Sequence, residues 1–149
     1  MSELVLEVRD VSKRFHGIQA LDHVSLSLER GKVYGLVGRN GAGKTTLMRI
    51  ICGMSYPTSG YVSLFGQTSE AELCRCRARM GCLIESPAVY TRLTVNENMA
   101  MRALQKGCYD KDEILRDLDM VGLSKVCNRR VCHLSLGIRQ RLGIALALV

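Results

Sequence analysis

The segment from Gly38 to Thr46, GRNGAGKTT, holds the residues with the clearest chemical purpose. It matches the pattern G-x-x-x-x-G-K-[ST], with Gly38, Gly43, Lys44 and Thr45 at the fixed positions. Glycines permit backbone turns that other residues resist, so successive N–H groups can converge on phosphate oxygens. The lysine and hydroxyl that follow supply a cation for the β- and γ-phosphates and an oxygen ligand for Mg²⁺. This spacing predicts a site for a nucleoside triphosphate.

The flanking sequence places this loop between two regular elements. Residues 32–38, KVYGLVG, are nearly continuously apolar, which predicts a strand buried on both faces. After the loop, apolar residues recur at helical spacing, at Leu47, Ile50, Ile51 and Met54. A strand, a glycine-rich loop and a helix in this order form a phosphate cradle. A plain glycine turn with a surface lysine is the competing interpretation, and these flanks weigh against it.

The composition is that of a globular protein. The chain has 149 residues, of which 47% are apolar and 23% charged, enough for one domain with a core. No apolar run approaches the roughly 20 residues that a membrane helix requires. The first residues, MSELVLEV, lack the layout of a signal peptide. We therefore expect a soluble, cytoplasmic protein without a membrane span of its own.

Seven cysteines are scattered along the chain. The number is odd and no secretion signal precedes them, so reduced thiols are expected. Cys74, Cys76 and Cys82 lie close enough in sequence to hold zinc, but they lack a paired C-x-x-C or a histidine partner. Cysteines packed in the core and in helices are the favoured interpretation.

The formal net charge is +7, and the C-terminal end is rich in basic residues. A basic patch can face nucleic acid or an anionic membrane surface. The phosphate-binding chemistry explains part of this charge, and an acidic remainder beyond Val149 would explain more. No nucleic-acid partner is therefore expected.

Two alternating apolar segments flank the residues KRFHGIQAL near the N-terminus. Residues 4–9 and 24–28 each place every second side chain on one face, which predicts two half-buried strands, the second ending at Gly31. Phe15 lies between them, just before a loop glycine. An antiparallel lip beside a parallel core follows from this layout. The elements expected after the phosphate-loop helix are a short strand at 61–65, a helix at 70–79 and a buried strand at 80–84.

The chain changes character after residue 85, and no convincing strand is seen from 86 to 134. Two capping boxes, Thr94-x-x-Glu97 and Asp110-x-x-Glu113, open predicted helices. Ser135 is placed to cap a last helix. The side chains expected on the apolar faces of these three helices are Val95, Met99 and Ala103; Ile114, Leu115, Leu118 and Val121; and Ile138, Leu142, Ala145, Leu146 and Val149.

Residues 134–141, LSLGIRQR, resemble the signature sequence of the nucleotide-binding subunits of ATP-binding cassette (ABC) transporters. In that family the signature follows a phosphate loop at about the distance seen here, and the resemblance covers most of the chain in the family's order. The segment IESPAVYTRLTVNENM falls where the loop joining the core to the helical subdomain belongs. IESP together with LSLG is similar to exporters of peptide antibiotics such as bacitracin and lantibiotics.

The resemblance implies binding of ATP and Mg²⁺ and assigns residues to both. The phosphate loop would contribute Gly38, Arg39, Asn40, Gly41, Ala42, Gly43, Lys44, Thr45 and Thr46 to ATP binding. Thr45 and Glu85 would contact Mg²⁺. Phe15 matches the aromatic residue that stacks on adenine, although a hydrophobic plug is the alternative. Ser135 and Gly137 would meet the γ-phosphate of ATP held by a second subunit, although Ser135 could also be only a helix cap.

Two departures from the family pattern bear on these roles. The signature usually has Gly where this chain has Leu136 and Gln where it has Ile138, which puts the backbone fit and any contact from position 138 in doubt. The connecting loop usually offers a Gln where this chain has Glu85. A carboxylate is a good ligand for Mg²⁺, so metal contact can persist, with an extra negative charge near the γ-phosphate.

The fold implied by the resemblance is α/β: a P-loop NTPase core with a parallel sheet, an antiparallel β lip and a helical subdomain. Residues 1–85 would form the nucleotide-binding core and lip, 86–134 the helical subdomain and 135–149 the signature helix. The family places a strand ending in Asp, a catalytic Glu and a switch His after that helix, where this sequence ends. We therefore expect an incomplete ABC ATPase domain without a complete set of catalytic residues. Glu85 is the one residue of this sequence expected to contribute to catalysis.

The function implied is that of an ATP-binding subunit of an exporter, which couples ATP binding and hydrolysis at a dimer interface to transport. Antimicrobial-peptide export or resistance fits the subgroup. A second nucleotide-binding subunit, in a homodimer, and integral membrane permease subunits would be its partners, at the inner face of the cell membrane. These 149 residues alone are expected to bind ATP without turnover. A soluble ABC-type ATPase acting on nucleic acid or ribosomes is the main alternative, and a binding module without turnover is another.

Overall fold

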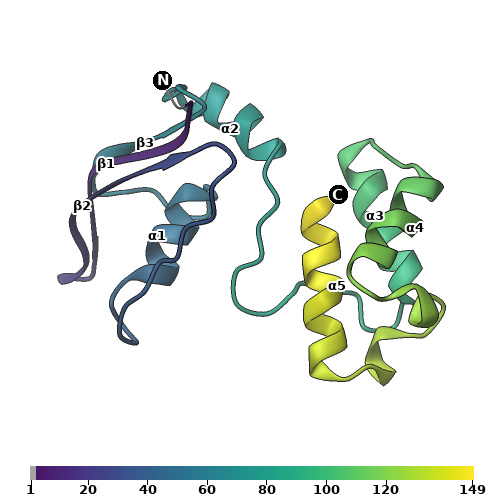
Figure 1. Cartoon of the computed structure of the whole chain (residues 1–149). Helices are drawn as coiled ribbons and strands as arrows, with labels where there is room; N and C mark the ends of the chain where they lie inside the picture. The colour runs from purple at the N-terminus through teal and green to yellow at the C-terminus, as the bar shows by residue number, and fades with distance from the viewer. Residues whose placement is uncertain (1–2) are drawn as a thin grey trace. The chain divides into compact units, whose positions relative to one another are not determined.

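The computed structural model describes residues 3–149. The chain divides into two compact units, a first one that ends at Met80 and a second one from Gly81 to Val149 (Figure 1). Each unit has its own buried apolar cluster. No helix formed by the described residues is long and apolar enough to cross a membrane.

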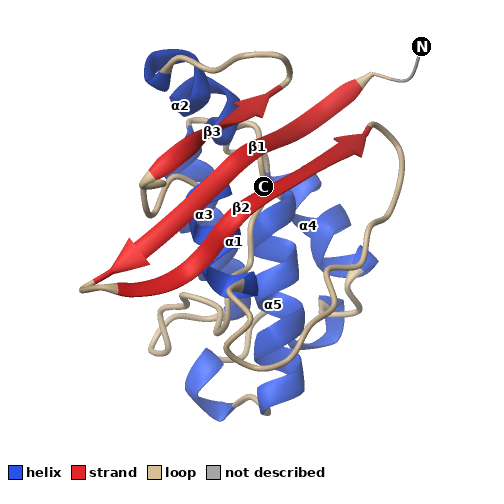
Figure 2. Cartoon of the chain, turned by 90° about the vertical axis from the view of Figure 1, so that its left-hand side faces the viewer, coloured by secondary structure: helices blue, strands red, loops and turns tan. Residues whose placement is uncertain are grey.

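The first unit is built on a three-stranded antiparallel sheet with the order β2-β1-β3 (Figure 2). Its strands are β1 (Leu4–Phe15), β2 (Ile18–Glu29) and β3 (Ser59–Leu64). The predicted antiparallel lip is confirmed, but the first two strands are longer than their alternating segments. Phe15 pairs with Ile18 across the β1–β2 hairpin.

The hairpin tip consists of His16 and Gly17, which both have positive φ, 44° and 87°. Two central residues with positive φ are the requirement of a type I′ turn, the tight connection that matches strand twist. The strands can therefore continue up to this turn. Phe15 consequently lies at the end of a paired strand and not in a loop between strands.

Two helices accompany the sheet, α1 (Lys44–Ile51) and α2 (Glu70–Ala78). In Figure 2, α1 lies behind the sheet, and its Leu47 and Ile50 side chains are buried in the same cluster as Val8 and Val11 of β1. The prediction that Met54 shares this face is wrong. The helix ends at Ile51, two residues before Gly53 with φ 75°, so Met54 falls outside the helical period and is 63% exposed.

The two strands predicted for the parallel core do not form among the described residues. Residues 32–39 and 80–84 are not part of any strand. Val33 and Val37 are almost fully exposed, contrary to a strand buried on both faces. An extended segment becomes a strand only when a neighbour pairs with its N–H and C=O groups, and no segment within residues 3–149 pairs with either one. Their apolar sequence is right for a buried strand, but burial depends on partners.

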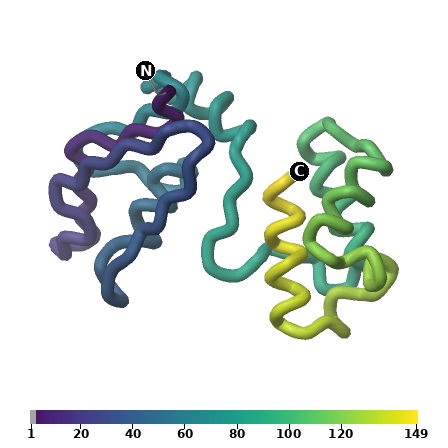
Figure 3. Tube along the Cα trace, in the orientation of Figure 1, coloured from purple at the N-terminus to yellow at the C-terminus, as the bar shows by residue number. Residues whose placement is uncertain are grey.

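The second unit is helical, as the absence of strand signals over 86–134 predicted. It contains α3 (Val95–Lys106), α4 (Lys111–Met120) and α5 (Leu136–Leu148), with short 3₁₀ turns η1 (Ser124–Val126) and η2 (Val131–His133). The tube in Figure 3 follows the chain through these helices. The core residues of this unit are Val95, Met99, Ala103, Ile114, Leu118, Leu123, Val131, Leu134, Leu142 and Ala145.

One predicted core position in this unit is wrong. Leu115 is 43% exposed, whereas its neighbour Ile114 and also Leu118 are buried. Ile114 and Leu118 are four residues apart and therefore share a face. The apolar stripe of α4, a helix of 10 residues, is narrow, and Leu115 lies beside this stripe and not in it.

Candidate nucleotide-binding site

The segment Gly38–Thr46 ends at the start of α1 in a glycine-built turn. Gly41 and Gly43 both have positive φ, 83° and 86°, which confirms the predicted need for glycine at these two positions. Gly43 is the N-cap residue of α1, no side chain caps this start, and its first turn carries no acidic residue. The first N–H groups of the helix therefore keep donors and a positive dipole end for an anion from outside the chain.

Gly43 also fixes where the loop lies. A Cβ at this position would come within 2.4 Å of the Ala20 carbonyl oxygen and 2.7 Å of Leu21 Cδ2. Both neighbours belong to β2, and one of them is backbone that cannot move aside. The phosphate loop is thus packed directly against the strand that follows the Phe15 hairpin, within the same unit.

The Lys44 side chain folds back over the loop. Its Nζ donates hydrogen bonds to the carbonyl oxygens of Gly38 and Arg39, at 2.6 and 2.8 Å. The Ala42 N–H donates to the Arg39 carbonyl at 3.1 Å, and this bond closes the turn of residues 39–42. The ammonium group is therefore held by the backbone of the loop, and the next residue, Thr45, is exposed.

Phe15 presents an aromatic ring at the hairpin end of β1. The residue is 45% exposed, which does not fit the alternative of a plug in the core. The ammonium of Lys13, two residues earlier on the same strand, lies 4.9 Å from the ring centroid. An exposed, flat ring on a rigid hairpin is suited to stacking on a base.

In the second unit, Ser135 is the N-cap of α5, as predicted. Its hydroxyl accepts a hydrogen bond from the Ile138 N–H, at the long distance of 3.4 Å. Apart from the adjoining helix backbone and chain neighbours, no atom of residues 3–149 lies within 4 Å of a Cβ built on Gly137, and Leu136 is 73% exposed. Leu136 therefore meets no steric conflict within the unit.

The turn before α5 is held by a residue that sequence reasoning missed. Arg139 donates through Nε to the Leu134 carbonyl at 3.1 Å and through Nη2 to the Cys132 carbonyl at 3.3 Å. A single side chain thereby fixes the backbone on the N-terminal side of Ser135. The start of α5 has no acidic residue in its first turn, as in α1.

A family model described as "ABC transporter" matches residues 21–149. The chain belongs to the ABC transporter family. This confirms the resemblance carried by the phosphate loop and the LSLGIRQR segment. Phe15 lies just before the matched residues.

Individual ABC proteins of known name are similar over nearly the whole chain. The chain is 37% identical over 145 residues to the bacitracin transport ATP-binding protein BcrA of Bacillus licheniformis, covering 97% of this chain and 47% of that protein. It is 35% identical to the lantibiotic transport ATP-binding protein SrtF of Streptococcus pyogenes, covering 97% of this chain and 62% of that protein. The chain thus spans about half the length of the first relative and less than two thirds of the second.

The fold is shared with solved ABC proteins. A structure described as the ATP-binding subunit of an ABC transporter superposes with a TM-score of 0.83 at 28% identity, over 95% of this chain and 60% of that one. The predicted fold class, a partial ABC ATPase domain with an antiparallel lip and a helical subdomain, is therefore confirmed. Its parallel strands are the part that the described residues do not form.

Glu85 lies near the start of the second unit, on the segment before α3. It is exposed and has a positive φ of 63°, uncommon for a residue with a side chain. This backbone conformation turns the chain sharply between Ile84 and Ser86. Glu85, Ser135 and Gly137 belong to the second unit, whereas Phe15 and the phosphate loop belong to the first.

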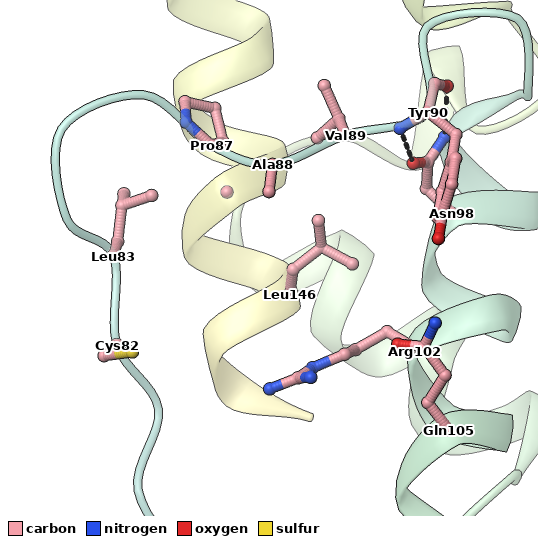
Figure 4. A pocket seen from close by; sticks show the side chains of 11 residues that line it. Cys82, Leu83, Pro87, Ala88, Val89, Tyr90, Asn98, Arg102, Gln105 and Leu146 are labelled. Atoms are coloured by element: carbon pink, nitrogen blue, oxygen red, sulfur yellow. Dashed lines mark hydrogen bonds between the residues drawn. The ribbon is translucent and has the colours of Figure 1, made fainter. Parts of the chain in front are cut away.

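Asn98 is a second residue that sequence reasoning missed. It is buried on α3, where its amide accepts from the Tyr90 N–H at 2.8 Å and donates to the carbonyls of Tyr90 and Thr94, at 3.0 and 2.8 Å (Figure 4). The segment after Glu85 is thereby tied to α3. The only signal in the sequence is a polar residue beside Met99 on the inward face of a predicted helix.

The segment clamped by Asn98 borders a cavity of about 470 Å³ (Figure 4). Its walls come from the segment 82–90, from α3 and from α5. Apolar side chains such as Pro87, Val89 and Leu146 contribute most of the lining, and Arg102 is its one charged residue. This hollow surface in the ABC chain lies wholly within the second unit.

Proposed function

We propose that this chain is the ATP-binding part of a transporter subunit, with residues 38–46 as the phosphate site and Phe15 as the platform for adenine. The observation that carries the proposal is the start of α1, where glycine replaces a side-chain cap and no carboxylate repels a phosphate. Lys44 lies in the same loop as the cation for the β- and γ-phosphates. The names of BcrA and SrtF, both transport ATP-binding proteins, agree with this assignment.

Mg²⁺ fits the donor chemistry of the residues proposed to hold it. Thr45 is an exposed residue directly after the lysine proposed to bind the phosphates, and its hydroxyl is a hard oxygen ligand. The Glu85 carboxylate is a second oxygen ligand of the kind Mg²⁺ prefers. The ion would neutralise charge on the β- and γ-phosphates.

The start of α5 is proposed to bind the γ-phosphate of ATP held by a second copy of the subunit. Ser135 and Gly137 stand at a helix N-terminus without acidic residues, and Gly137 leaves its surroundings open. Two copies in a homodimer would then share two ATP molecules. Each copy would bind one through its phosphate loop and the other through α5.

Permease subunits of the cell membrane are the proposed further partners, contacted from the cytoplasmic side through the segment around residues 85–90. The cavity beside this segment offers an apolar surface, and the bonds of Asn98 give the segment a fixed shape. Peptide antibiotics are the proposed cargo, because BcrA and SrtF are named for bacitracin and lantibiotic transport. ATP binding and hydrolysis would drive closure of the dimer and hence transport.

Replacing Lys44 with Ala tests the core of this proposal. The variant should lose measurable Mg-ATP binding in a calorimetric titration, because the cation facing the β/γ-phosphates is gone. Lys125→Ala, which removes an exposed lysine from η1, is the control matched for charge and should bind as the unaltered chain does. Unchanged affinity in Lys44→Ala, or an equal loss in both variants, would rule out the phosphate site.

A further inference from the structure

Lys13 makes two contacts that together fix its position on β1. Its Nζ lies 4.9 Å from the centroid of the Phe15 ring and donates a hydrogen bond of 2.6 Å to the Tyr56 carbonyl oxygen. The pairing of β1 with β2 is irregular on both sides of Lys13, between Val11 and Lys13 and between Lys13 and Arg14, so the place of this side chain is given by its contacts and not by strand alternation. Val11 is buried in the core, Lys13 is half-buried and Phe15 is exposed. The lysine therefore bridges from the edge of the core to the ring.

The hydrogen bond to the Tyr56 carbonyl links Lys13 to a part of the chain outside its own strand. Tyr56 belongs to the connection between α1 and β3, more than 40 residues further along the chain. Lys13 forms no ion pair with a carboxylate in residues 3–149, and its ammonium contacts the Tyr56 carbonyl and the Phe15 ring instead. Because the hydrogen bond to the backbone oxygen fixes the ammonium, the ammonium can in turn hold the exposed ring in place through a cation–π contact.

The contact leaves the ring with two unlike faces. A cation over an aromatic ring is attracted by the negative charge above the ring plane, so Lys13 occupies one face of Phe15. Phe15 is nevertheless 45% exposed, so a flat ligand can also reach the ring. Without the lysine, an exposed phenylalanine beside a tight turn would be free to change rotamer at little cost.

We propose that Lys13 is a positioning residue for base recognition, which holds Phe15 so that the purine of a nucleotide stacks on the ring's other face. The proposal rests on the proposed function, in which Phe15 contacts the base. Lys13 would act through the ring and not on the phosphates. It would therefore strengthen binding of adenine nucleotides and have no effect on a ligand that lacks a base.

The test compares two ligands on a small set of variants. Lys13→Met keeps a flexible apolar stem and removes the charge, and Lys13→Arg keeps a cation. Arg14→Met is the matched control, because Arg14 is the next residue and donates instead to Gln19. Each protein is titrated calorimetrically with Mg-ATP and with Mg-tripolyphosphate, and thermal unfolding without ligand confirms that each one is folded.

Lys13→Met should weaken Mg-ATP between about two- and fivefold, the affinity ratio that corresponds to an exposed cation–π contact. Binding of tripolyphosphate should stay unchanged, and Lys13→Arg and Arg14→Met should bind both ligands as the unaltered chain does. An equal loss for both ligands would show that the ammonium acts on the phosphates and would overturn the proposal. So would unchanged ATP binding in Lys13→Met, or failure of Lys13→Arg to retain it.

A Phe15→Ala variant separates this inference from the function on which it rests. Phe15→Ala should weaken ATP about fivefold or more while sparing tripolyphosphate, and adding Lys13→Met to it should cause no further loss. If Phe15→Ala is selective and Lys13→Met is not, only the role of Lys13 fails. If Phe15→Ala leaves ATP affinity unchanged, the base platform fails and the role of Lys13 fails with it.

Discussion

The starts of α1 and α3 differ in whether the chain itself provides partners for their first backbone N–H groups. A helix begins with N–H groups that have no partner inside the helix. At α3 the chain supplies both partners itself: the Thr94 hydroxyl accepts from the Glu97 N–H at 3.1 Å, and the Glu97 carboxylate accepts from the Thr94 N–H at 2.7 Å. At α1 a left-handed glycine, Gly43, stands in the same place, and no side chain accepts from these groups.

This difference separates a helix start built for stability from one suited to a ligand. The hydrogen bonds from Thr94 lower the pKa of the Glu97 carboxyl, a sign that the helix start stabilises a negative charge. At α1 the same stabilisation is not used by the chain and is available to a phosphate. The start of α4 resembles that of α3, since Asp110 accepts from the N–H groups of Asp112 and Glu113 at 2.8 and 3.1 Å.

The start of α5 lies between these two types. Ser135 caps it, but through one bond of 3.4 Å, and no acidic residue follows in the first turn. Its donors are therefore less fully used than those of α3 and α4. This agrees with the proposal that α5 also meets a phosphate, in that case one bound to a partner.

The largest expected effect comes from filling the space at Gly43. Gly43→Ala places a methyl group 2.4 Å from the Ala20 carbonyl in a left-handed conformation, which we expect to cost about 2–5 kcal/mol of unfolding free energy from strain and overpacking together. Mg-ATP binding should be lost as well. Urea unfolding followed by circular dichroism, with a titration of ATP, measures both.

Gly41→Ala is the matched control for that variant. Gly41 has nearly the same φ, 83°, but among the described residues no atom outside its two chain neighbours lies within 4 Å of the added Cβ. Only the backbone strain of about 1–2 kcal/mol should remain. If the two substitutions cost the same, packing of the loop against β2 does not position the start of α1, and the contrast with α3 loses its structural basis.

Local features of the site were predictable because each depends on residues close together in sequence. The turn at Gly41 and Gly43, the caps at Thr94, Asp110 and Ser135, and the inward faces of α3 and α5 all follow from spacing. The box predicted at Asp110 is half right. Asp110 caps α4, but Glu113 does not return the bond that Glu97 makes at α3.

Features that depend on distant partners were not predictable in the same way. The segments 32–38 and 80–84 have the sequence of buried strands, yet strand formation is decided by a neighbour that no local pattern reveals. Lys13 is similar, because its hydrogen bond goes to Tyr56, which is remote in sequence. Asn98 looked like an ordinary polar residue of a helix, and only the fold shows that the backbone at Tyr90 is its partner.

A smaller effect is expected from removing caps at α3 and α5. Thr94→Ala should lower the unfolding free energy by about 1–2 kcal/mol, because a well-formed capping box loses one of its two bonds. Ser135→Ala should cost about 0.5 kcal/mol, the low end for caps, because its bond is long. Chemical denaturation of both variants gives the comparison.

The two variants also decide between the interpretations of Ser135. A loss in Ser135→Ala as large as that in Thr94→Ala would make this serine a structural cap of the ordinary kind. A small loss of unfolding free energy would show that the cap contributes little to stability, as expected if the hydroxyl instead binds the phosphate of a partner. Ser135→Thr keeps a hydroxyl at the cap position and should retain the stability of the unaltered chain.

The smallest expected effect is a difference in acid sensitivity between helix starts. Bonds from the backbone N–H groups of Glu113 and Asp112 lower the pKa of Asp110, and those from Thr94 lower that of Glu97. A lowered pKa in the folded state means that the ionised group stabilises the fold above its ordinary pKa, about 3.9 for Asp and 4.3 for Glu, and that this stabilisation is lost as pH falls through the folded value. The starts of α3 and α4 should therefore loosen below about pH 4. The first turn of α1 has no carboxylate and should not loosen in this window.

Amide exchange protection measured by NMR along a pH series, corrected for intrinsic rates, checks this at Ile114 and Asn98 against Leu47. Asp110→Asn should remove the pH dependence at α4 alone, because an amide can still accept at the cap but does not titrate in this range. If protection at α1 and α4 falls in parallel, global acid unfolding controls both, and the contrast between a self-capped start and an open one does not extend to their response to pH.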